Sequence, residues 1–288
     1  MLNPISFDTF IGQTKVKSNL KVCVESANTL AYPLDHVLLC GPPGLGKTTL
    51  AEIIAEELQV RISKFMGPQL DKIDKLSFLH CQNSYSVVFI DEIHALPRKV
   101  EEALYEPLER FTFENQKVRP FTLIGATTRE GYLTKPLHDR FTIVETLIPY
   151  TQEELATVVK NSATKLSITI TADAALEVAK RSRGVPRQAN QLLKRISYYD
   201  RNINTVIAQN ALDKIGINNL GLDDLDKRIL NTIYKNGPVG IDALSNILGE
   251  DRETIESTRE PYLVRQEYIR RTERGRCITD KGKIAMAR

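Results

Sequence analysis

The sequence lacks the features of membrane-spanning, secreted and disulfide-rich proteins. Its 288 residues hold four cysteines (Cys23, Cys40, Cys81 and Cys277) and no C-x-x-C pair, which excludes a disulfide framework and a zinc site. No run approaches the roughly 18 consecutive apolar residues of a transmembrane helix. The first residues, MLNPISFDTFIGQ, lack the basic and apolar regions of a secretory signal. We therefore expect a cytoplasmic protein that has reduced thiols and no membrane partner.

The chain also lacks internal repeats and low-complexity tracts. Hydrophobic residues make up 42% and charged residues 26%, which is typical of a folded protein and excludes a disordered or fibrous one. The length predicts two domains, or three small ones. The net charge of +3 is too small to prove a nucleic-acid partner. Residues 262–288, however, hold eight basic and three acidic side chains, so this segment alone carries +5.

Four short apolar runs divide the first 150 residues, at 36–41, 87–91, 121–127 and 143–148. Such runs, separated by amphipathic helical stretches, are typical of buried parallel strands. They predict an α/β domain with a parallel sheet over residues 1–150.

The remainder of the chain predicts two further domains. Residues 151–218 show helical patterns, and Thr151 with Glu154 forms a capping-box pattern that begins the first helix. Residues 219–288 show three short helical patterns and then a basic hairpin that turns at Glu273, Arg274 and Gly275. This outline is typical of a winged helix.

The strongest motif is GPPGLGKT, Gly41–Thr48, which fits G-x-x-x-x-G-K-[ST] between a predicted strand and a predicted helix. Its glycines, Gly44 and Gly46 among them, allow backbone N–H groups to surround phosphates. Lys47 is expected to contact the β- and γ-phosphates, and the Thr48 hydroxyl to hold Mg²⁺. The following helix adds positive charge at its N-terminus. The motif predicts a nucleoside triphosphate site.

A second apolar run ends in two carboxylates, Asp91 and Glu92. Asp91 is expected to belong to the Mg²⁺ shell and Glu92 to polarise the attacking water. His94 follows closely, and a single histidine in this position is more often structural than a metal ligand.

Three further positions carry weaker signals. Thr127 and Thr128 end the third run and could sense the γ-phosphate, although threonine is common in strands. Arg140 lies in a predicted turn and Arg187 at the start of a predicted helix. From the residues alone, either arginine could equally be an ordinary surface cation without a role in the site.

Six segments follow one another along the chain: GPPGLGKTTLA, FIDEIH, FTLIGATTR, LTKPLHDRF, RSRGVPRQANQLLKR and GLDDLDKRIL. They resemble the RuvB family, the Holliday-junction branch-migration ATPases of the AAA+ class, and the resemblance extends in order from about Leu2 to the C-terminus. The resemblance implies a P-loop AAA+ domain, a helical lid and a winged helix. It also implies a hexameric ring that hydrolyses ATP to pump duplex or four-way-junction DNA.

The resemblance also implies roles for individual residues. Gly44, Lys47, Thr48 and Thr49 match the phosphate loop, Asp91 and Glu92 the metal-binding and water-activating pair, and Thr128, with Thr127, the sensor. Arg140 matches the arginine finger that acts on a neighbour's ATP, Arg187 the second sensor, and Tyr150 the nucleotide contact at the hinge. Leu2 and Asn3 fall where the family contacts the base, and Asn3 replaces the usual arginine.

Arg271, Arg274 and Arg276 alternate along the predicted hairpin, and the resemblance places Arg271 and Arg276 on DNA. Phosphate contacts of this kind give affinity without sequence choice. Glu273 replaces a proline of the family there and weakens the local positive field. A charged solvated surface or a protein-binding winged helix would carry similar residues.

The largest departure from the family is the connection TFENQKVR, residues 112–119. The family has a long β-hairpin there that docks the RuvA partner, whereas eight residues allow only a small turn or a stubby hairpin. We therefore expect no RuvA-like docking of the usual kind. This departure leaves two alternatives, a switch-type ATPase such as a helicase loader or clamp-loader-like protein, and a DNA-binding adaptor with another partner. The intact set of Lys47, Asp91, Glu92 and Arg140 argues against the adaptor.

Overall fold

The computed structural model describes residues 6–81 and 85–286, and the chain divides into two compact units. The first unit runs to Glu154 and includes Val185–Arg187, while the second consists of Leu155–Gly184 and Gln188–Arg288. Each unit is described by itself below.

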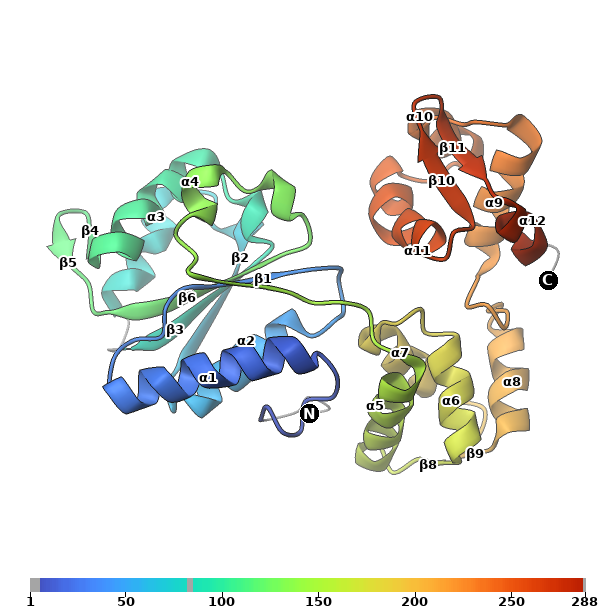
Figure 1. Cartoon of the computed structure of the whole chain (residues 1–288), viewed down its shortest axis with the longest axis horizontal. Coiled ribbons are helices and arrows are strands. Elements are labelled where there is room, and N and C mark those ends of the chain that lie inside the picture. The colour runs from blue at the N-terminus through green and yellow to red at the C-terminus, as the bar shows by residue number, and fades with distance from the viewer. Residues whose placement is uncertain (1–5, 82–84, 287–288) are drawn as a thin grey trace. The chain divides into compact units, whose positions relative to one another are not determined.

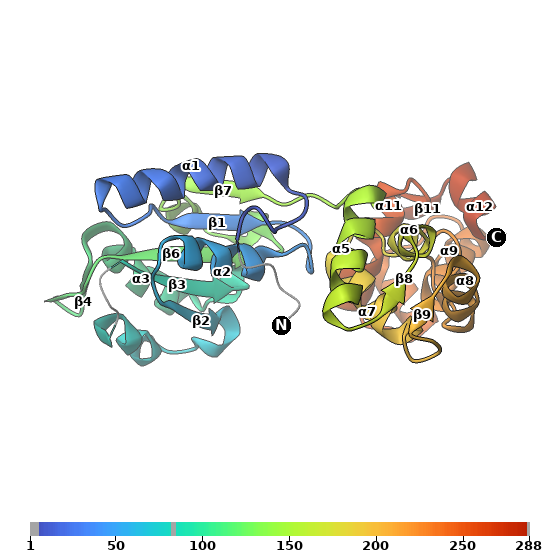
Figure 2. The same ribbon diagram turned by 90° about the horizontal axis from the view of Figure 1, so that it is seen from below.

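A five-stranded parallel sheet forms the centre of the first unit. Its strands are β1 (Val37–Cys40), β2 (Ile62–Met66), β3 (Ser86–Asp91), β6 (Phe121–Thr127) and β7 (Ile143–Thr146). They lie in the order β2-β3-β6-β1-β7 (Figure 2). The α/β prediction is confirmed. Strand β2, at one edge of the sheet, was not predicted because its residues, ISKFM, include polar side chains and do not form an apolar run.

Helices cover both faces of this sheet. Helices α1 (Thr14–Leu30) and α2 (Lys47–Glu57) lie on one face, and α3 (Arg98–Arg110) and α4 (Lys135–His138) on the other (Figure 1). Short 3₁₀ turns complete the layers at Gly67–Gln69, Ile73–Cys81, Ile93–Ala95 and Glu130–Tyr132. The apolar side of α3, with Val100, Leu104 and Leu108, packs in one core cluster with β3 and β6. This core fixes the carboxyl ends of the strands at one edge.

The connection at residues 112–119 folds as a stubby hairpin. Strands β4 (Thr112–Phe113) and β5 (Gln116–Lys117) pair antiparallel, and both turn residues, Glu114 and Asn115, have positive φ. Two successive left-handed residues are typical of a type I′ turn, whose twist matches that of the flanking strands. The hairpin projects from the end of the unit (Figure 1).

The first part of the second unit is a helical bundle of α5 (Gln152–Lys165), α6 (Ala172–Lys180), α7 (Pro186–Ile196) and α8 (Thr205–Lys214). A two-stranded parallel ladder joins β8 (Thr169–Ile170) to β9 (Asn202–Ile203). The capping box before α5, which the first unit contains, is confirmed: the Thr151 amide donates to Glu154 and the Glu154 amide donates to Thr151. Helix α8 was not predicted.

The second part is a winged helix with its own core cluster. Its elements are α9 (Asp224–Asn236), α10 (Ile241–Leu248), a π-helical turn (Thr254–Arg259), α11 (Glu260–Arg265), β10 (Ile269–Thr272), β11 (Gly275–Ile278) and α12 (Asp280–Met286). Strands β10 and β11 pair antiparallel, and Val239 forms an isolated antiparallel bridge with Arg276 of β11. The predicted basic wing is therefore present. Within the described parts of the chain, no helix has both the length and the apolar character to span a membrane.

Candidate functional site

The carboxyl ends of three adjacent strands bring the predicted nucleotide residues together. Strand β6 lies between β3 and β1, and Thr127 at its end is paired with Cys40 at the end of β1. Gly41 follows β1, and Asp91 ends β3. Ligands of open parallel sheets bind at this edge.

Lys47 begins α2 and lies buried beneath the loop that precedes it. Its amine donates to the carbonyls of Gly41 at 2.6 Å and Pro42 at 3.1 Å. Burial lowers the pKa of the Lys47 amine, and the carboxylates of Glu92 and Asp91 oppose that shift. Two backbone carbonyls thus confine the amine to the phosphate loop.

Two glycines of the loop have neighbours that leave no space for a side chain. Gly44 has φ of +82°, and a Cβ there would lie 2.9 Å from Cβ of Arg187. Gly46 has φ of +107°, and a Cβ there would lie 2.9 Å from the Phe10 ring. Both positions therefore require glycine for the backbone conformation and for the close approach. Phe10 is a site residue that carries no sequence signal, because its segment holds no motif and is distant in the sequence from the phosphate loop.

The oxygen atoms expected to hold Mg²⁺ lie side by side. Thr48 Oγ1 is 3.5 Å from Asp91 Oδ2, and the Glu92 amide donates to the other Asp91 oxygen at 3.0 Å. Hydroxyl and carboxylate oxygens are ligands that Mg²⁺ prefers. Thr49 lies half-buried in the same first turn of α2.

Glu92 is held by the end of the neighbouring strand β6. The Thr128 hydroxyl donates to Glu92 Oε2 at 3.0 Å, and the Thr128 amide does so at 3.4 Å. His94 Nδ1 lies 3.3 Å from the same oxygen and 2.9 Å from the Thr127 hydroxyl. Thr128 and His94 thus contact the predicted water-activating carboxylate directly, and Thr127 is linked to it through His94.

Tyr150 and Arg187 also meet the phosphate loop. The buried Tyr150 hydroxyl donates to the Leu45 carbonyl at 3.2 Å, and burial raises the pKa of this phenol. The Arg187 amide donates to the Gly44 carbonyl at 3.4 Å, while its side chain is exposed. Tyr150 therefore contacts the phosphate loop through its side chain and Arg187 through its backbone. Leu2 and Asn3 lie outside the described residues.

Arg140 makes its contacts away from the phosphate loop. Its guanidinium lies 4.0 Å from the Tyr105 ring centroid, forms an ion pair with Glu109 at 2.7 Å and donates to the Pro136 carbonyl at 2.5 Å. Only 17% of its side chain is exposed. These contacts fix the direction of the guanidinium. Tyr105 and Glu109 gave no sequence signal because their partner is thirty residues or more along the chain.

The wing arginines differ in their availability. Arg276 forms hydrogen bonds with Glu260 at 2.9 Å and lies 3.4 Å from Glu256, so that its side chain is only 12% exposed. Arg271 also bonds Glu260, at 2.8 Å, but remains 57% exposed. Arg274 is exposed at the turn. Although burial favours the neutral carboxyl, the two arginines hold the pKa of Glu260 below its usual value.

Models of three domain families match the chain in succession. They are the Holliday junction DNA helicase RuvB P-loop domain at residues 2–147, the RuvB AAA lid domain at 150–218 and the RuvB C-terminal winged helix domain at 219–287. The fold is accordingly a P-loop AAA+ domain with a parallel sheet, followed by a lid and a winged helix, as predicted.

Curated relatives and solved structures agree with these matches. The Holliday junction branch migration complex subunit RuvB of Fusobacterium nucleatum is 43% identical over 97% of this chain and 91% of its own length. The protein of the same name from Latilactobacillus sakei is 45% identical over 98% and 90%. The structure of the Thermotoga maritima RuvB Holliday junction branch migration motor superposes with a TM-score of 0.93 at 44% identity, over 99% of this chain and 98% of that one.

Proposed function

The chain belongs to the RuvB family of Holliday junction branch-migration motors, and we propose that its ATP hydrolysis at the site described above moves junction DNA. It is an ATP hydrolase of this type. The comparisons do not favour the loader or adaptor alternatives. The observation that carries the proposal is the convergence of Lys47, Thr48, Asp91, Glu92 and Thr128 at one edge of the sheet.

The residues of this edge divide the chemistry among them. Lys47 and the amides of the loop bind the phosphates. Tyr150 and Arg187 hold the loop in place by hydrogen bonds to its carbonyls. Thr48 and Asp91 fit Mg²⁺, and the bound ion would neutralise charge on the phosphates. Glu92 orients and polarises the attacking water, and Thr128 fixes the direction of the Glu92 carboxylate.

Arg140 serves a neighbouring subunit in this proposal. Its contacts with Tyr105 and Glu109 support a fixed guanidinium that acts outside its own phosphate loop. Hydrolysis then requires a closed ring, which the family resemblance gives as a hexamer. Arg187 links the nucleotide to the lid. The division into residues 1–150, 151–218 and 219–288 is part of this proposal, and the ranges of the three family models support it.

DNA binds the winged helix in this proposal, with Arg271 and Arg274 as the accessible cations of the wing. Arg276 contributes mainly by holding the hairpin on Glu260. The stubby β4–β5 hairpin supports a motor that does not dock a RuvA-like protein by a long apolar arm. We place the activity in the cytoplasm, where chromosomal junctions and ATP meet.

A branch-migration assay of the purified full chain tests the proposal. We expect a labelled four-way junction with homologous arms to be resolved into duplexes only with hydrolysable ATP and Mg²⁺. The Glu92→Gln variant should bind ATP and DNA but release no product. Slow hydrolysis that DNA does not stimulate, without junction movement, would contradict the motor and indicate a switch ATPase.

A further inference from the structure

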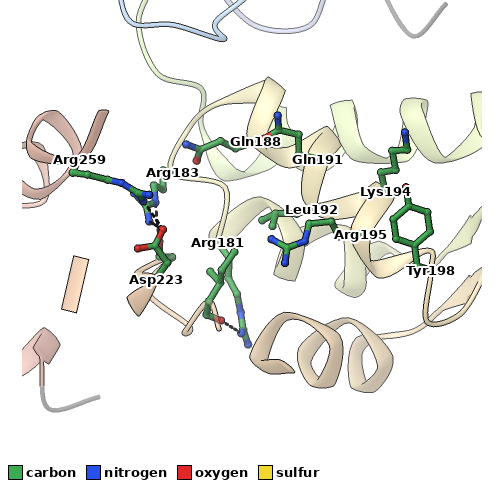
Figure 3. Close-up of a pocket in the computed structure, with 12 residues that line it drawn as sticks. Arg181, Arg183, Gln188, Gln191, Leu192, Lys194, Arg195, Tyr198, Asp223 and Arg259 are labelled. Atoms are coloured by element: carbon green, nitrogen blue, oxygen red, sulfur yellow. Dashed lines mark hydrogen bonds and ion pairs between the residues drawn. The ribbon is translucent and has the colours of Figure 1, made fainter. Parts of the chain in front are cut away.

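A groove of about 360 Å³ lies in the second unit, beside α7. Figure 3 shows Arg183, Asp223 and Arg259 gathered at one end and Lys194, Arg195 and Tyr198 at the other. Its charged lining consists of five basic side chains and one acidic one: Arg181, Arg183, Lys194, Arg195, Arg259 and Asp223. The groove is therefore suited to an anion.

Three of these cations already have partners within the fold. Arg181 bonds Asp213 at 2.5 Å, Arg183 bonds Asp226, and Arg259 bonds Asp223. Arg259 still has a buried Nε that makes no hydrogen bond to any described residue. At this end of the groove the arginines are thus fixed and largely neutralised by carboxylates, and the buried Arg259 Nε remains as a donor without a partner among the described residues.

The other end carries cations without carboxylate partners. Helix α7 contains no acidic residue, and Lys194 and Arg195 lie exposed in its last turn. Across residues 6–81 and 85–286, neither side chain makes an ion pair or a hydrogen bond. Gln188 and Gln191 line the groove along the same helix and offer amide donors. Guanidinium, ammonium and amide groups are the usual partners of backbone phosphates.

Exposed aromatic rings adjoin these cations. Tyr198 is 74% exposed and Tyr199 is 54% exposed, and the Lys214 amine lies 5.7 Å from the Tyr199 ring centroid. Tyrosine hydroxyl groups, like basic side chains, are common donors to the phosphate oxygens of DNA.

The distribution of charge favours the same surface. Residues 151–218 hold ten basic and six acidic side chains, whereas residues 219–288 hold thirteen and twelve. The lid therefore carries +4 and the winged helix only +1. In addition, Arg271 and Arg276 of the wing share Glu260. The wing alone offers few free cations to a polyanion.

We propose that Gln188, Gln191, Lys194, Arg195 and Tyr198 of the lid bind the phosphate backbone of duplex DNA, as a contact separate from the wing. This inference rests on the proposed function, since it adds a second surface for the same DNA. Helix α7 would then carry Arg187, next to the Gly44 carbonyl, in its first turn and a DNA contact in its last. A shift of α7 during hydrolysis would therefore be passed directly to the DNA.

The full chain with Lys194→Ala and Arg195→Ala tests this inference. The matched control is Lys160→Ala with Lys165→Ala, which removes the same charge from α5 of the same lid. Duplex binding is followed by fluorescence anisotropy at several salt concentrations, with a non-hydrolysable ATP analogue. We expect on the order of tenfold weaker binding for the groove variant and a shallower dependence of the affinity on salt concentration. The reason is that the variant contacts fewer phosphates and therefore releases fewer counterions when it binds. The single variant Arg195→Lys, which keeps the positive charge, should retain most of the wild-type affinity for DNA.

Three results would overturn the inference. Equal affinity and salt slope in the groove variant and the wild type would leave the groove without DNA. Equal losses in the groove variant and the α5 control would reduce the effect to net charge. A groove variant that assembles into rings poorly in sedimentation, but whose assembled rings bind DNA with normal affinity, would make the groove a contact between copies of the chain. A wild type that binds no DNA would instead refute the proposed function itself.

Discussion

Glu92 occupies a backbone conformation that few side chains adopt. Its φ is +49°, in the left-handed region, which costs about 1–2 kcal/mol for a residue with a Cβ. Such strain persists where surrounding contacts fix the residue, and here the contacts come from Thr128 and His94. The carboxylate therefore has one preferred direction before any substrate binds.

Removing the Thr128 hydroxyl should release that carboxylate. We expect Thr128→Ala to lower kcat for ATP by about 10²-fold, the smaller end of a general-base contribution, while KM changes little. Thr128→Ser, which keeps the hydroxyl, should recover most of the rate. Steady-state hydrolysis measures both constants. A raised KM with an unchanged kcat would instead make Thr128 a nucleotide-binding residue.

His36 is a buried neutral histidine in the first unit. The Leu123 amide donates to Nδ1 at 3.0 Å, so Nε2 carries the proton and donates to the Leu108 carbonyl at 3.0 Å. Burial lowers the pKa of His36 from its ordinary 6.5, against the opposing effect of the Leu108 carbonyl. A lowered pKa means that the neutral form stabilises the fold above pH 6.5. That contribution is lost as the pH falls from 6.5 through the lower pKa of the folded state.

We therefore expect the melting temperature of the full chain to fall between pH 7.5 and pH 5.5, and to fall less in His36→Gln, which cannot titrate. Scanning calorimetry at several pH values provides the comparison. Parallel curves for the wild type and His36→Gln would show that His36 does not control this stability.

At the residue level, the sequence predicted those site members that motifs carry. Lys47, Thr48, Asp91 and Glu92 follow strand ends, and a parallel sheet brings such ends together. Phe10, Glu109 and Glu260 were missed because their roles depend on partners distant in the sequence. His94 was interpreted as structural, and its contact with the Glu92 carboxylate depends on a left-handed turn that no residue pattern signals.

Among the elements, apolar runs found β1, β3, β6 and the edge strand β7. The other edge strand, β2, was missed because polar residues interrupt its sequence ISKFM, which therefore forms no apolar run. Helix α8 was missed because alanine and polar residues dilute its apolar stripe. The wing was predicted as a hairpin, and the structure adds the reason for its stability. Glu260, at the start of α11, is buried between Arg271 and Arg276 of the two strands.

That arrangement separates two wing arginines by role. Arg276→Ala would leave the Glu260 carboxylate buried with one partner, which is strongly destabilising for such a pair. We expect faster amide hydrogen exchange across β10 and β11 in this variant. Arg274→Ala, at the exposed turn, should leave exchange unchanged and weaken duplex binding. Unchanged exchange in Arg276→Ala would contradict the structural role of the pair.

At the scale of the whole molecule, the Arg140 guanidinium is held by its own subunit but serves another in the proposed ring. Arg140→Ala alone should bind ATP normally and lose about 10³-fold or more in hydrolysis. Lys47→Ala alone should also be inactive, since it lacks the cation of the phosphate loop. The two defects lie in different halves of one composite site if the finger acts in trans.

Mixing the two inactive variants distinguishes action in trans from action in cis. In a random one-to-one ring, about a quarter of the interfaces join an intact phosphate loop to an intact Arg140, because each interface of a ring uses two different surfaces. We therefore expect the mixture to recover a substantial fraction of wild-type hydrolysis, although neither variant is active alone. Glu109→Gln, which removes the charge that orients Arg140, should lower kcat in homogeneous rings without changing ATP affinity. If mixed rings form in sedimentation but remain inactive, the finger acts within its own subunit, and the ring is not required for the chemistry.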